Sequence, residues 1–204
     1  MKLNVMFASG LLVLAGCNQQ PATPAAAGTG ATPAEAPTVR TFPADFKLDT
    51  PIPAAAIKTD MALEGVPHYD AKNDVLLFDV RVNNGGTIPL VSVGKAPIQL
   101  AVNLAGPDGV DKAPGKRLVG RASVPLIQPG SSGVAKVHVP AEAALGQTVR
   151  VELFQEGVGW FGRRYNQPTL DIGTFQRCKN GAKTLCDTSG SPVASQGVAP
   201  EASN

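Results

Sequence analysis

The sequence predicts an all-β protein whose main domain is an antiparallel β-sandwich. Several short segments alternate apolar and polar residues with a period of two, which is the pattern of a strand with one buried face. Turn signals separate these segments, in a chain that holds 22 glycines and 18 prolines among 204 residues. No long helical periodicity competes with this pattern. Short alternating strands with regular turns are typical of a sandwich.

The first strong strand signal lies at residues 76–83, where the even positions are apolar until the end and Asp79, Arg81 and Asn83 face the other way. Residues 98–104 repeat the pattern, and so do 135–139, 149–153 and the weaker 170–172. Residues 142–145 predict a single helical turn before the strand at 149. Glycine and proline turn signals lie between these segments, at Asn84-Gly85-Gly86, Pro107-Asp108-Gly109, Pro129-Gly130 and Leu145-Gly146.

The first 16 residues have the layout of a secretory signal, with Lys2 before an apolar stretch and small residues at its end. The apolar stretch is about half the roughly 20 residues that a transmembrane helix needs. It ends on Leu14-Ala15-Gly16-Cys17, which resembles the lipobox of bacterial lipoproteins. The resemblance implies cleavage before Cys17 and lipidation of this residue, so the membrane is an expected partner through the lipid.

Composition divides the rest of the chain into three parts. Residues 17–42 are rich in Ala, Pro and Thr and predict a disordered linker, because they lack the bulky apolar residues that offset ordering entropy. Residues 43–188 form the predicted β-sandwich domain. Residues 189–204 are again small and polar, and we expect a disordered tail there.

Charge and cysteine usage narrow the function classes. Removing Lys2 with the signal leaves 17 basic and 16 acidic side chains from the 18 and 16 of the full chain. This balance offers no clustered basic surface for nucleic acid. Cys178 and Cys186 remain as an even pair in an exported chain, and an oxidising compartment makes a disulfide between them the expected state. Their spacing supports neither a redox motif nor a zinc site.

The strand ending in Val82-Asn83-Asn84-Gly85-Gly86, the Pro-Asp-Gly turn and Pro129-Gly130 resemble bacterial immunoglobulin-like domains. Residues 151–161, which include Gln155-Glu156-Gly157-Val158-Gly159-Trp160-Phe161, are similar to a strand and loop of immunoglobulin-like modules in envelope and glycan-assembly proteins. The resemblance covers residues 74–172. It implies an immunoglobulin-like sandwich and an envelope setting, and it transfers no catalytic residue.

The residues offer little for catalysis, so we expect no enzyme, no catalytic residue, no metal and no cofactor. His138 is predicted to point outward from a strand. His68 lies in a predicted loop with Asp70, and a metal or acid–base site there lacks the further ligands that such sites need. No nucleophile elbow or phosphate-binding glycine loop is present.

The candidate binding segment runs from residue 156 to 165. Trp160 is the only tryptophan of the chain, and aromatic faces beside arginine forks suit a carbohydrate or a protein anchor. The alternative is that Trp160 plugs the open end of the core, with arginine capping it. The candidate contact residues are Glu156, Trp160, Phe161, Arg163, Arg164 and Tyr165.

The sequence thus predicts a non-enzymatic, lipid-anchored protein of the cell envelope that presents an interaction module to a protein partner, for instance through unpaired sheet edges. A polysaccharide-binding lipoprotein is the alternative function. Asn18 follows the lipidated cysteine in place of the Asp that resembles an inner-membrane retention signal. The outer membrane is therefore the expected location in a cell with two membranes.

Overall fold

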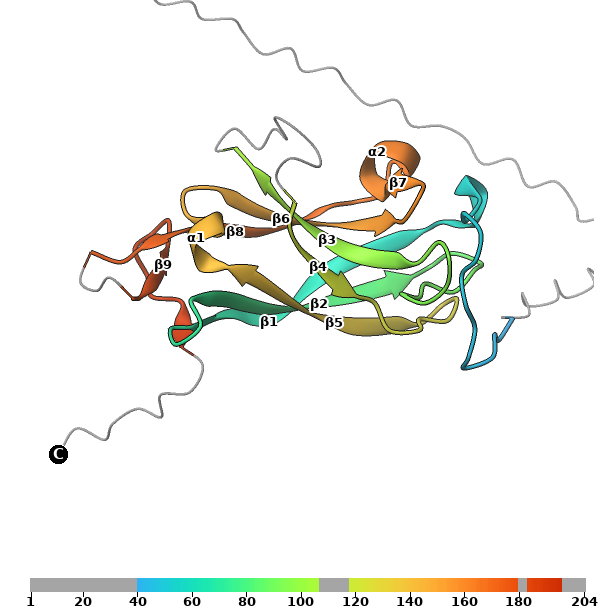
Figure 1. Cartoon of the computed structure of the whole chain (residues 1–204), viewed down its shortest axis with the longest axis horizontal. Coiled ribbons are helices and arrows are strands. Elements are labelled where there is room, and N and C mark those ends of the chain that lie inside the picture. Colours follow the sequence, from blue (N-terminus) through green and yellow to red (C-terminus); the bar gives the residue numbers. More distant parts are fainter. Residues whose placement is uncertain (1–39, 107–117, 180–182, 196–204) are drawn as a thin grey trace, which may run out of the picture. The chain divides into compact units, whose positions relative to one another are not determined.

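The computed structural model describes residues 40–106, 118–179 and 183–195. Cys17 and most of the predicted linker lie outside these residues, as does the Pro107-Asp108-Gly109 turn. Strands are the main secondary structure of the described chain, and they form two largely antiparallel sheets that pack as a sandwich (Figure 1). The predicted all-β sandwich is confirmed.

The smaller sheet has four strands in the order β10-β1-β2-β5. Its members are β1 (Thr59–Asp70), β2 (Val75–Asn84), β5 (Ser132–Pro140) and the short β10 (Ala194–Ser195). Three of them pair in antiparallel fashion, whereas β10 pairs with β1 in parallel, at His68 and Tyr69. The sheet therefore joins the first strand of the domain to the last.

The larger sheet has the order β4-β3-β6-β8-β9, and β7 pairs with β6 off this path. Its strands are β3 (Ile98–Ala105), β4 (Leu118–Ser123), β6 (Thr148–Gln155), β7 (Gly159–Trp160), β8 (Leu170–Arg177) and β9 (Leu185–Asp187). The helical pieces are short: η1 (Ala54–Ala56), α1 (Ala141–Ala144) and α2 (Phe161–Tyr165). The turn of helix expected at 142–145 is present as α1.

The core lies between the sheets, where the predicted alternation places it. On β2 the side chains of Leu76, Phe78, Val80 and Val82 are buried, and the residues between them are only half-buried. The even residues of β3 and the odd residues of β5 and β6 supply the facing side chains, namely Ile98, Leu100, Val102, Ala135, Val137, Val139, Val149, Val151 and Leu153. Periodicity alone was sufficient to predict these faces.

The edges of the two sheets are mostly covered or interrupted. On one side β4 lies against β5, so closely that a Cβ at Gly120 would be 3.0 Å from the carbonyl oxygen of His138. On the other side the pairing of β1 shifts register between Glu64 and His68, at a bulge that contains Pro67. Bulges and prolines limit strand addition at an edge. The sheet edges therefore offer a partner less backbone than an unbroken sandwich edge would.

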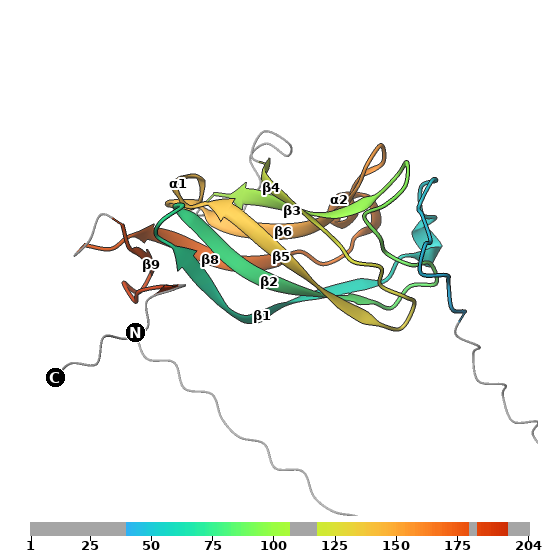
Figure 2. The same cartoon turned by 60° about the horizontal axis from the view of Figure 1, so that its bottom comes forward.

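The segment before β1 crosses one end of the sandwich and is tied there by two glutamines. The buried Gln155 accepts a hydrogen bond from the Ile52 amide at 3.1 Å and donates to the Thr50 carbonyl at 3.3 Å. Gln128 pairs with both backbone groups of Phe42. Figures 1 and 2 show this segment at the end of the sandwich opposite β9.

Several sequence predictions differ from the structure at their boundaries. The described residues extend beyond the predicted domain limits of 43 and 188. Gln128 binds the backbone of Phe42 at the start of the domain, and β10 pairs with β1 at its end. The described residues 189–195 therefore do not belong to a disordered tail. His68 lies within β1 and not in a loop. The Pro67 bulge interrupts the alternation of β1, so its period-two pattern could not be recognised in the sequence.

Candidate functional site

The candidate site lies on the outer face of the larger sheet, where the β6–β7 turn reverses the chain. Gly157 and Gly159 have φ values of 72° and 122° there, a backbone conformation that glycine adopts without strain. The turn places Trp160 opposite Phe154 in the register of the two strands. Cross-strand partners share one face of a sheet, so the two aromatic side chains meet.

Phe154 and Trp160 form a half-exposed aromatic pair. Their ring centroids are 5.1 Å apart and their planes are tilted by 59°. Trp160 is not part of the buried hydrophobic core, so the structure does not support its role as the core plug. The neighbouring Phe161 is fully buried and has that role.

Charged groups surround the aromatic pair. The guanidinium carbon of Arg121, from β4, lies 5.1 Å from the centroid of the Phe154 ring. Arg121 also forms an ion pair with Glu156, and both side chains stay more than one third exposed. An exposed ion pair of this kind contributes at most about 1 kcal/mol to stability. We call the four residues Arg121, Phe154, Glu156 and Trp160 the aromatic patch.

The structure separates the six predicted contact residues. Glu156 and Trp160 belong to the aromatic patch, whereas Phe161 is core. Tyr165 is half-buried, and its ring meets that of Phe161 edge to face at 5.4 Å. Arg163 and Arg164 are exposed on α2, and Arg164 lies 5.8 Å from the Tyr165 ring.

Two members of the aromatic patch, Phe154 and Arg121, were not among the candidate residues predicted from the sequence. Phe154 has the outward parity of Arg150 and Glu152 on the same strand, so the alternation held a signal for it. Arg121 comes from a strand distant in sequence, and only the pairing of β4 with β3 brings it to the patch. No sequence pattern encodes that neighbourhood.

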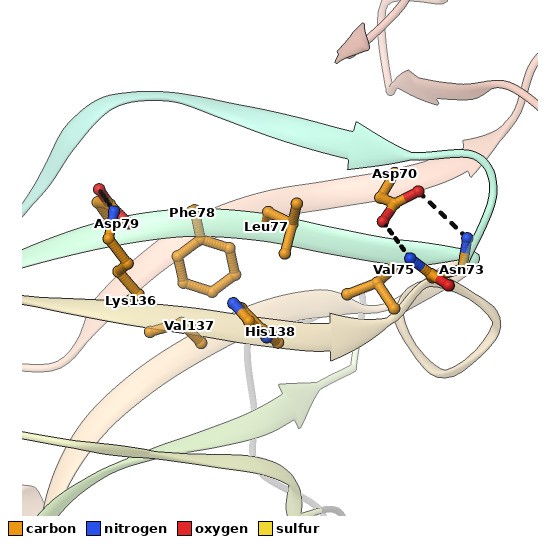
Figure 3. A pocket seen from close by; sticks show the side chains of 9 residues that line it. All are labelled: Asp70, Asn73, Val75, Leu77, Phe78, Asp79, Lys136, Val137 and His138. Carbon is orange, nitrogen blue, oxygen red and sulfur yellow. Dashed lines mark hydrogen bonds and ion pairs between the residues drawn. The ribbon is translucent and has the colours of Figure 1, made fainter. Parts of the chain in front are cut away.

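His68 and His138 lie on the outer face of the smaller sheet. Both are paired with Leu77, from opposite sides, because β2 runs between β1 and β5. A depression of about 440 Å³ on this face is lined in part by Asp70, Asp79 and His138 (Figure 3). Among the described residues, no group of three or more His, Cys, Asp or Glu could hold a metal ion.

Asp70 serves the turn between β1 and β2. Its carboxylate accepts hydrogen bonds from the Asn73 side chain at 2.6 Å and from the amides of Lys72 and Asn73. The Asn73 side chain and backbone hold the pKa of Asp70 below its usual value. A carboxylate that accepts this many local bonds is explained by the turn itself.

A polar cluster joins the two sheets near α1. Arg177 of β8 donates to Asp74 at 2.8 Å and to the hydroxyl of the buried Tyr69 at 2.9 Å, and this hydroxyl donates to Asp74 at 2.7 Å. The Arg177 guanidinium, and then the Tyr69 hydroxyl, hold the pKa of Asp74 below its usual value. Burial, and then the hydrogen bond to Asp74, raises the pKa of Tyr69. Tyr69, Asp74 and Arg177 form what we call the Asp74 cluster.

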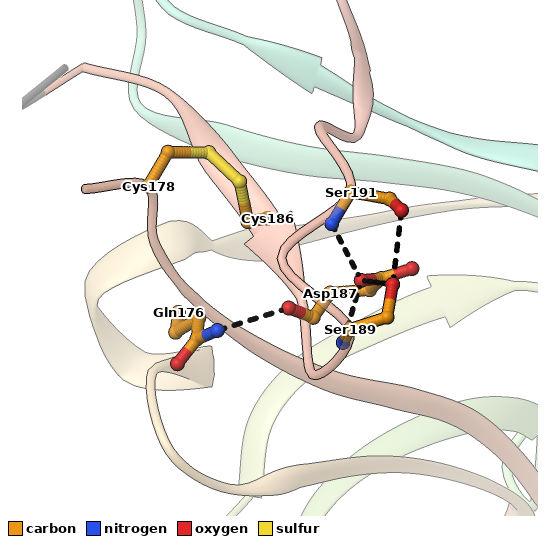
Figure 4. Close-up of a disulfide and its surroundings, with 6 residues drawn as sticks. All are labelled: Gln176, Cys178, Cys186, Asp187, Ser189 and Ser191. Carbon is orange, nitrogen blue, oxygen red and sulfur yellow. Dashed lines mark hydrogen bonds between the residues drawn. A yellow bond between two sulfur atoms is a disulfide. The ribbon is translucent and has the colours of Figure 1, made fainter. Parts of the chain in front are cut away.

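The predicted disulfide is confirmed. Cys178 and Cys186 are bonded, with their Cα atoms 5.2 Å apart, and they close the end of the β8–β9 pair (Figure 4). Asp187 follows and accepts hydrogen bonds from Ser189 and Ser191 in the next turn. This end of the domain is therefore fixed by a covalent bond and a compact turn.

The comparisons with known proteins assign no family. No family model matches the chain, and no curated protein matches it. Within the described residues, no helix is long and apolar enough to cross a membrane.

Parts of several solved β-glucosidases are weakly similar. The enzyme from Paenibacillus barengoltzii is 18% identical with a TM-score of 0.29, over 60% of this chain and 15% of that one. β-Glucosidase 3B from Thermotoga neapolitana is 16% identical with a TM-score of 0.30, over 57% and 16%. The β-D-glucoside glucohydrolase from Trichoderma reesei is 13% identical with a TM-score of 0.32, over 56% and 18%. The chain spans less than a fifth of each structure, and similarity this low carries no argument about activity.

Proposed function

We propose that this chain is a lipid-anchored protein of the bacterial cell envelope whose β-sandwich binds a partner protein and catalyses no reaction itself. The Leu14-Ala15-Gly16-Cys17 motif after a short apolar stretch supports the lipid anchor. The bond between Cys178 and Cys186 fits an exported domain, since disulfides persist in oxidising compartments. Asn18 favours the outer membrane in a cell that has two membranes.

The aromatic patch is the observation that carries the binding proposal. Trp and Arg are enriched among the residues that dominate binding energy at protein interfaces. Here Trp160 and Arg121 lie on one sheet face together with Phe154 and Glu156, half-exposed and already positioned by strand pairing. Because β4 lies against β5 and a bulge interrupts β1, this face is better suited to a partner than those two edges are.

A polysaccharide is the second candidate partner. The half-exposed ring of Trp160 beside the Glu156 carboxylate favours it, because sugars stack on ring faces and donate hydrogen bonds to carboxylates. The geometry favours a protein more. The rings of Phe154 and Trp160 are tilted by 59° and so form no flat platform for successive sugar units.

The test is a crosslinked pull-down of the full lipoprotein from its own cells, with mass spectrometry and sugar analysis on the same eluate. We expect a protein partner in stoichiometric amounts with the wild type, and loss of this partner with the double variant Trp160→Ala, Glu156→Ala. The matched control is Val134→Ala, which removes an exposed apolar side chain from β5 of the other sheet.

Three outcomes decide between the candidates. Partner capture by the control but not by the double variant supports the aromatic patch. Sugar without stoichiometric protein replaces the first candidate with the second. Equal capture by all three proteins removes the aromatic patch from the contact surface.

A further inference from the structure

The end of the sandwich at which the described chain begins has an open depression of about 690 Å³. Phe42, Phe46 and Ile88 contribute half-buried apolar side chains to its lining, and the two phenyl rings meet edge to face at 5.1 Å. The lining includes Thr87 and Ile88 of the β2–β3 loop, and the N-terminal segment contacts this loop through backbone hydrogen bonds.

That loop presents Val93, whose exposed fraction of 50% is among the highest of the large apolar side chains in the described residues. Its position is fixed. The Leu48 amide donates to the Val93 carbonyl at 2.8 Å, and the Ala96 amide donates to the Leu48 carbonyl at 2.9 Å. Between them Gly94 has a φ of 121°, and a Cβ there would lie 2.3 Å from the Leu48 carbonyl oxygen. The backbone thus holds an apolar side chain in solvent.

The same end carries an excess of positive charge. Arg40, Lys47 and Lys95 are exposed, against the carboxylates of Asp45 and Asp49. The Asp49 carboxylate already accepts a hydrogen bond from the Lys95 amide at 3.0 Å. Exposed apolar side chains with basic residues around them are the composition of surfaces that lie at the boundary of lipid headgroups and acyl chains.

The short separation along the chain between this end and the expected lipid supports contact with a membrane. Arg40 follows Cys17 by 23 residues, and a chain of this length reaches at most about 76–83 Å even when fully extended. A covalent connection of limited reach raises the effective concentration of one end near the other. Even a low affinity of this end for the lipid surface is then sufficient to keep the two in contact.

We infer that this end of the domain rests on the anionic lipid surface into which Cys17 is anchored. We call it the tether end and define it by Phe42, Phe46, Ile88 and Val93 with Arg40, Lys47 and Lys95. Its apolar side chains lie at the headgroup boundary, and its basic side chains pair with phosphates. The inference rests on the proposed lipid anchor. It orients the sandwich, with the tether end toward the membrane and the Cys178–Cys186 end away from it.

The experiment uses one environment-sensitive fluorophore on the full lipoprotein. In the lipidated chain Cys17 is blocked and Cys178 and Cys186 are bonded, so Val93→Cys supplies the single thiol for labelling with nitrobenzoxadiazole. Lys72→Cys is the matched control. It is exposed in the turn after β1, a strand of 12 residues that spans about 40 Å from the tether end.

Both labelled proteins are reconstituted into vesicles of phosphatidylglycerol and phosphatidylcholine. At position 93 we expect a blue-shifted emission and quenching by brominated lipid in the anionic vesicles, both reduced by salt. At position 72 we expect neither. Lys47→Glu and Lys95→Glu in the Val93→Cys protein should each weaken the contact by at least about fivefold, since a cation near an anionic surface contributes about that factor.

Equal emission and quenching at positions 93 and 72 would overturn the inference. A blue shift at position 93 without quenching by brominated lipid would assign the apolar surroundings of the label to the protein itself, and it would also overturn the inference. Failure of the lipid anchor is recognised separately, because Cys17 then reacts with the label in the unsubstituted protein.

Discussion

At the residue scale, Trp160 and Phe161 show how neighbouring aromatic residues take different roles. Strand β7 ends at Trp160, and α2 begins at Phe161. The change from extended to helical backbone turns the second ring into the core, while the first remains on the sheet face beside Phe154. We therefore expect Phe161 to contribute mainly to stability and Trp160 mainly to binding.

Phe161→Ala is expected to lower the free energy of unfolding by about 3–5 kcal/mol, because it leaves a cavity in the core. Trp160→Ala should cost less, about 1–2 kcal/mol, because a half-exposed ring loses only part of its burial and one aromatic contact. Urea denaturation of both variants measures the difference. A larger loss of unfolding free energy for Trp160→Ala than for Phe161→Ala would mean that Trp160 is the residue that closes the core.

The Asp74 cluster makes stability depend on pH. The pKa of Asp74 is lowered in the folded protein by Arg177 and Tyr69, from a usual value of 3.8. The unfolded chain therefore binds a proton more readily than the folded one as the pH falls through this range. The contribution of Asp74 is complete above the usual pKa and is lost as the pH falls through the lowered one.

Asp74→Asn tests this linkage without disturbing the backbone, because Asn tolerates the φ of 54° at this position. We expect a loss of less than about 1 kcal/mol near pH 7, since the Asp74 side chain is partly exposed. The difference from the wild type should shrink in acid, in denaturant titrations from pH 7 down to pH 2. A difference that stays constant over this range would contradict an ionic role for Asp74.

At the scale of elements, the disulfide holds the β8–β9 pair together. β9 has only three residues, and its register with β8 extends over Phe175–Arg177. So short a strand contributes little by itself. Cys186 lies within this register, opposite Gln176, and the Cys178 amide donates to the Thr184 carbonyl at 2.9 Å. The bond between Cys178 and Cys186 therefore ties the two strands together at the end of their pairing.

Replacing both cysteines by Ala is expected to lower the free energy of unfolding by about 2–3 kcal/mol, the loop-entropy value for a sequence separation of 8. Thermal and urea unfolding of the oxidised protein, the reduced protein and the double variant measure this contribution. Reduction of the wild type should reproduce the variant. Unchanged stability on reduction would mean that β9 stays paired without the bond.

The strands that sequence predicted and those that it missed differ in regularity. Residues 76–83 keep their alternation throughout β2, because this strand lies between two others and buries one whole face. β1 is longer, yet its bulge at Gly65–Pro67 breaks the period. Its pairing with β10 depends on Ala194 and Ser195, which the sequence placed in a disordered tail. Irregular edge strands are recognisable only once their neighbours are known.

At the scale of the whole molecule, the proposed lipid anchor can be tested without changing the β-sandwich domain. Cys17→Ser removes the acceptor of the lipid and leaves every described residue unchanged. We expect the wild type to remain in the membrane fraction after a high-salt wash and to follow the outer membrane in a density gradient. The variant should be released by the wash, because the tether end alone binds weakly and through screened charges.

Two results would count against these expectations. Retention of Cys17→Ser in the washed membranes would place the anchor elsewhere in the chain. Enrichment of the wild type in the inner membrane would contradict the interpretation of Asn18. Circular dichroism of the variant controls for folding.

The sequence by itself determined the sandwich, the faces of its central strands and the cysteine pair, because periodicity and pairing of cysteines are local or compositional signals. It also pointed to Glu156 and Trp160. Only the tertiary structure brought Arg121 from β4 to Phe154, separated the roles of Trp160 and Phe161, and paired β10 with β1. These features depend on register and on contacts between segments distant along the chain, which no short sequence pattern specifies.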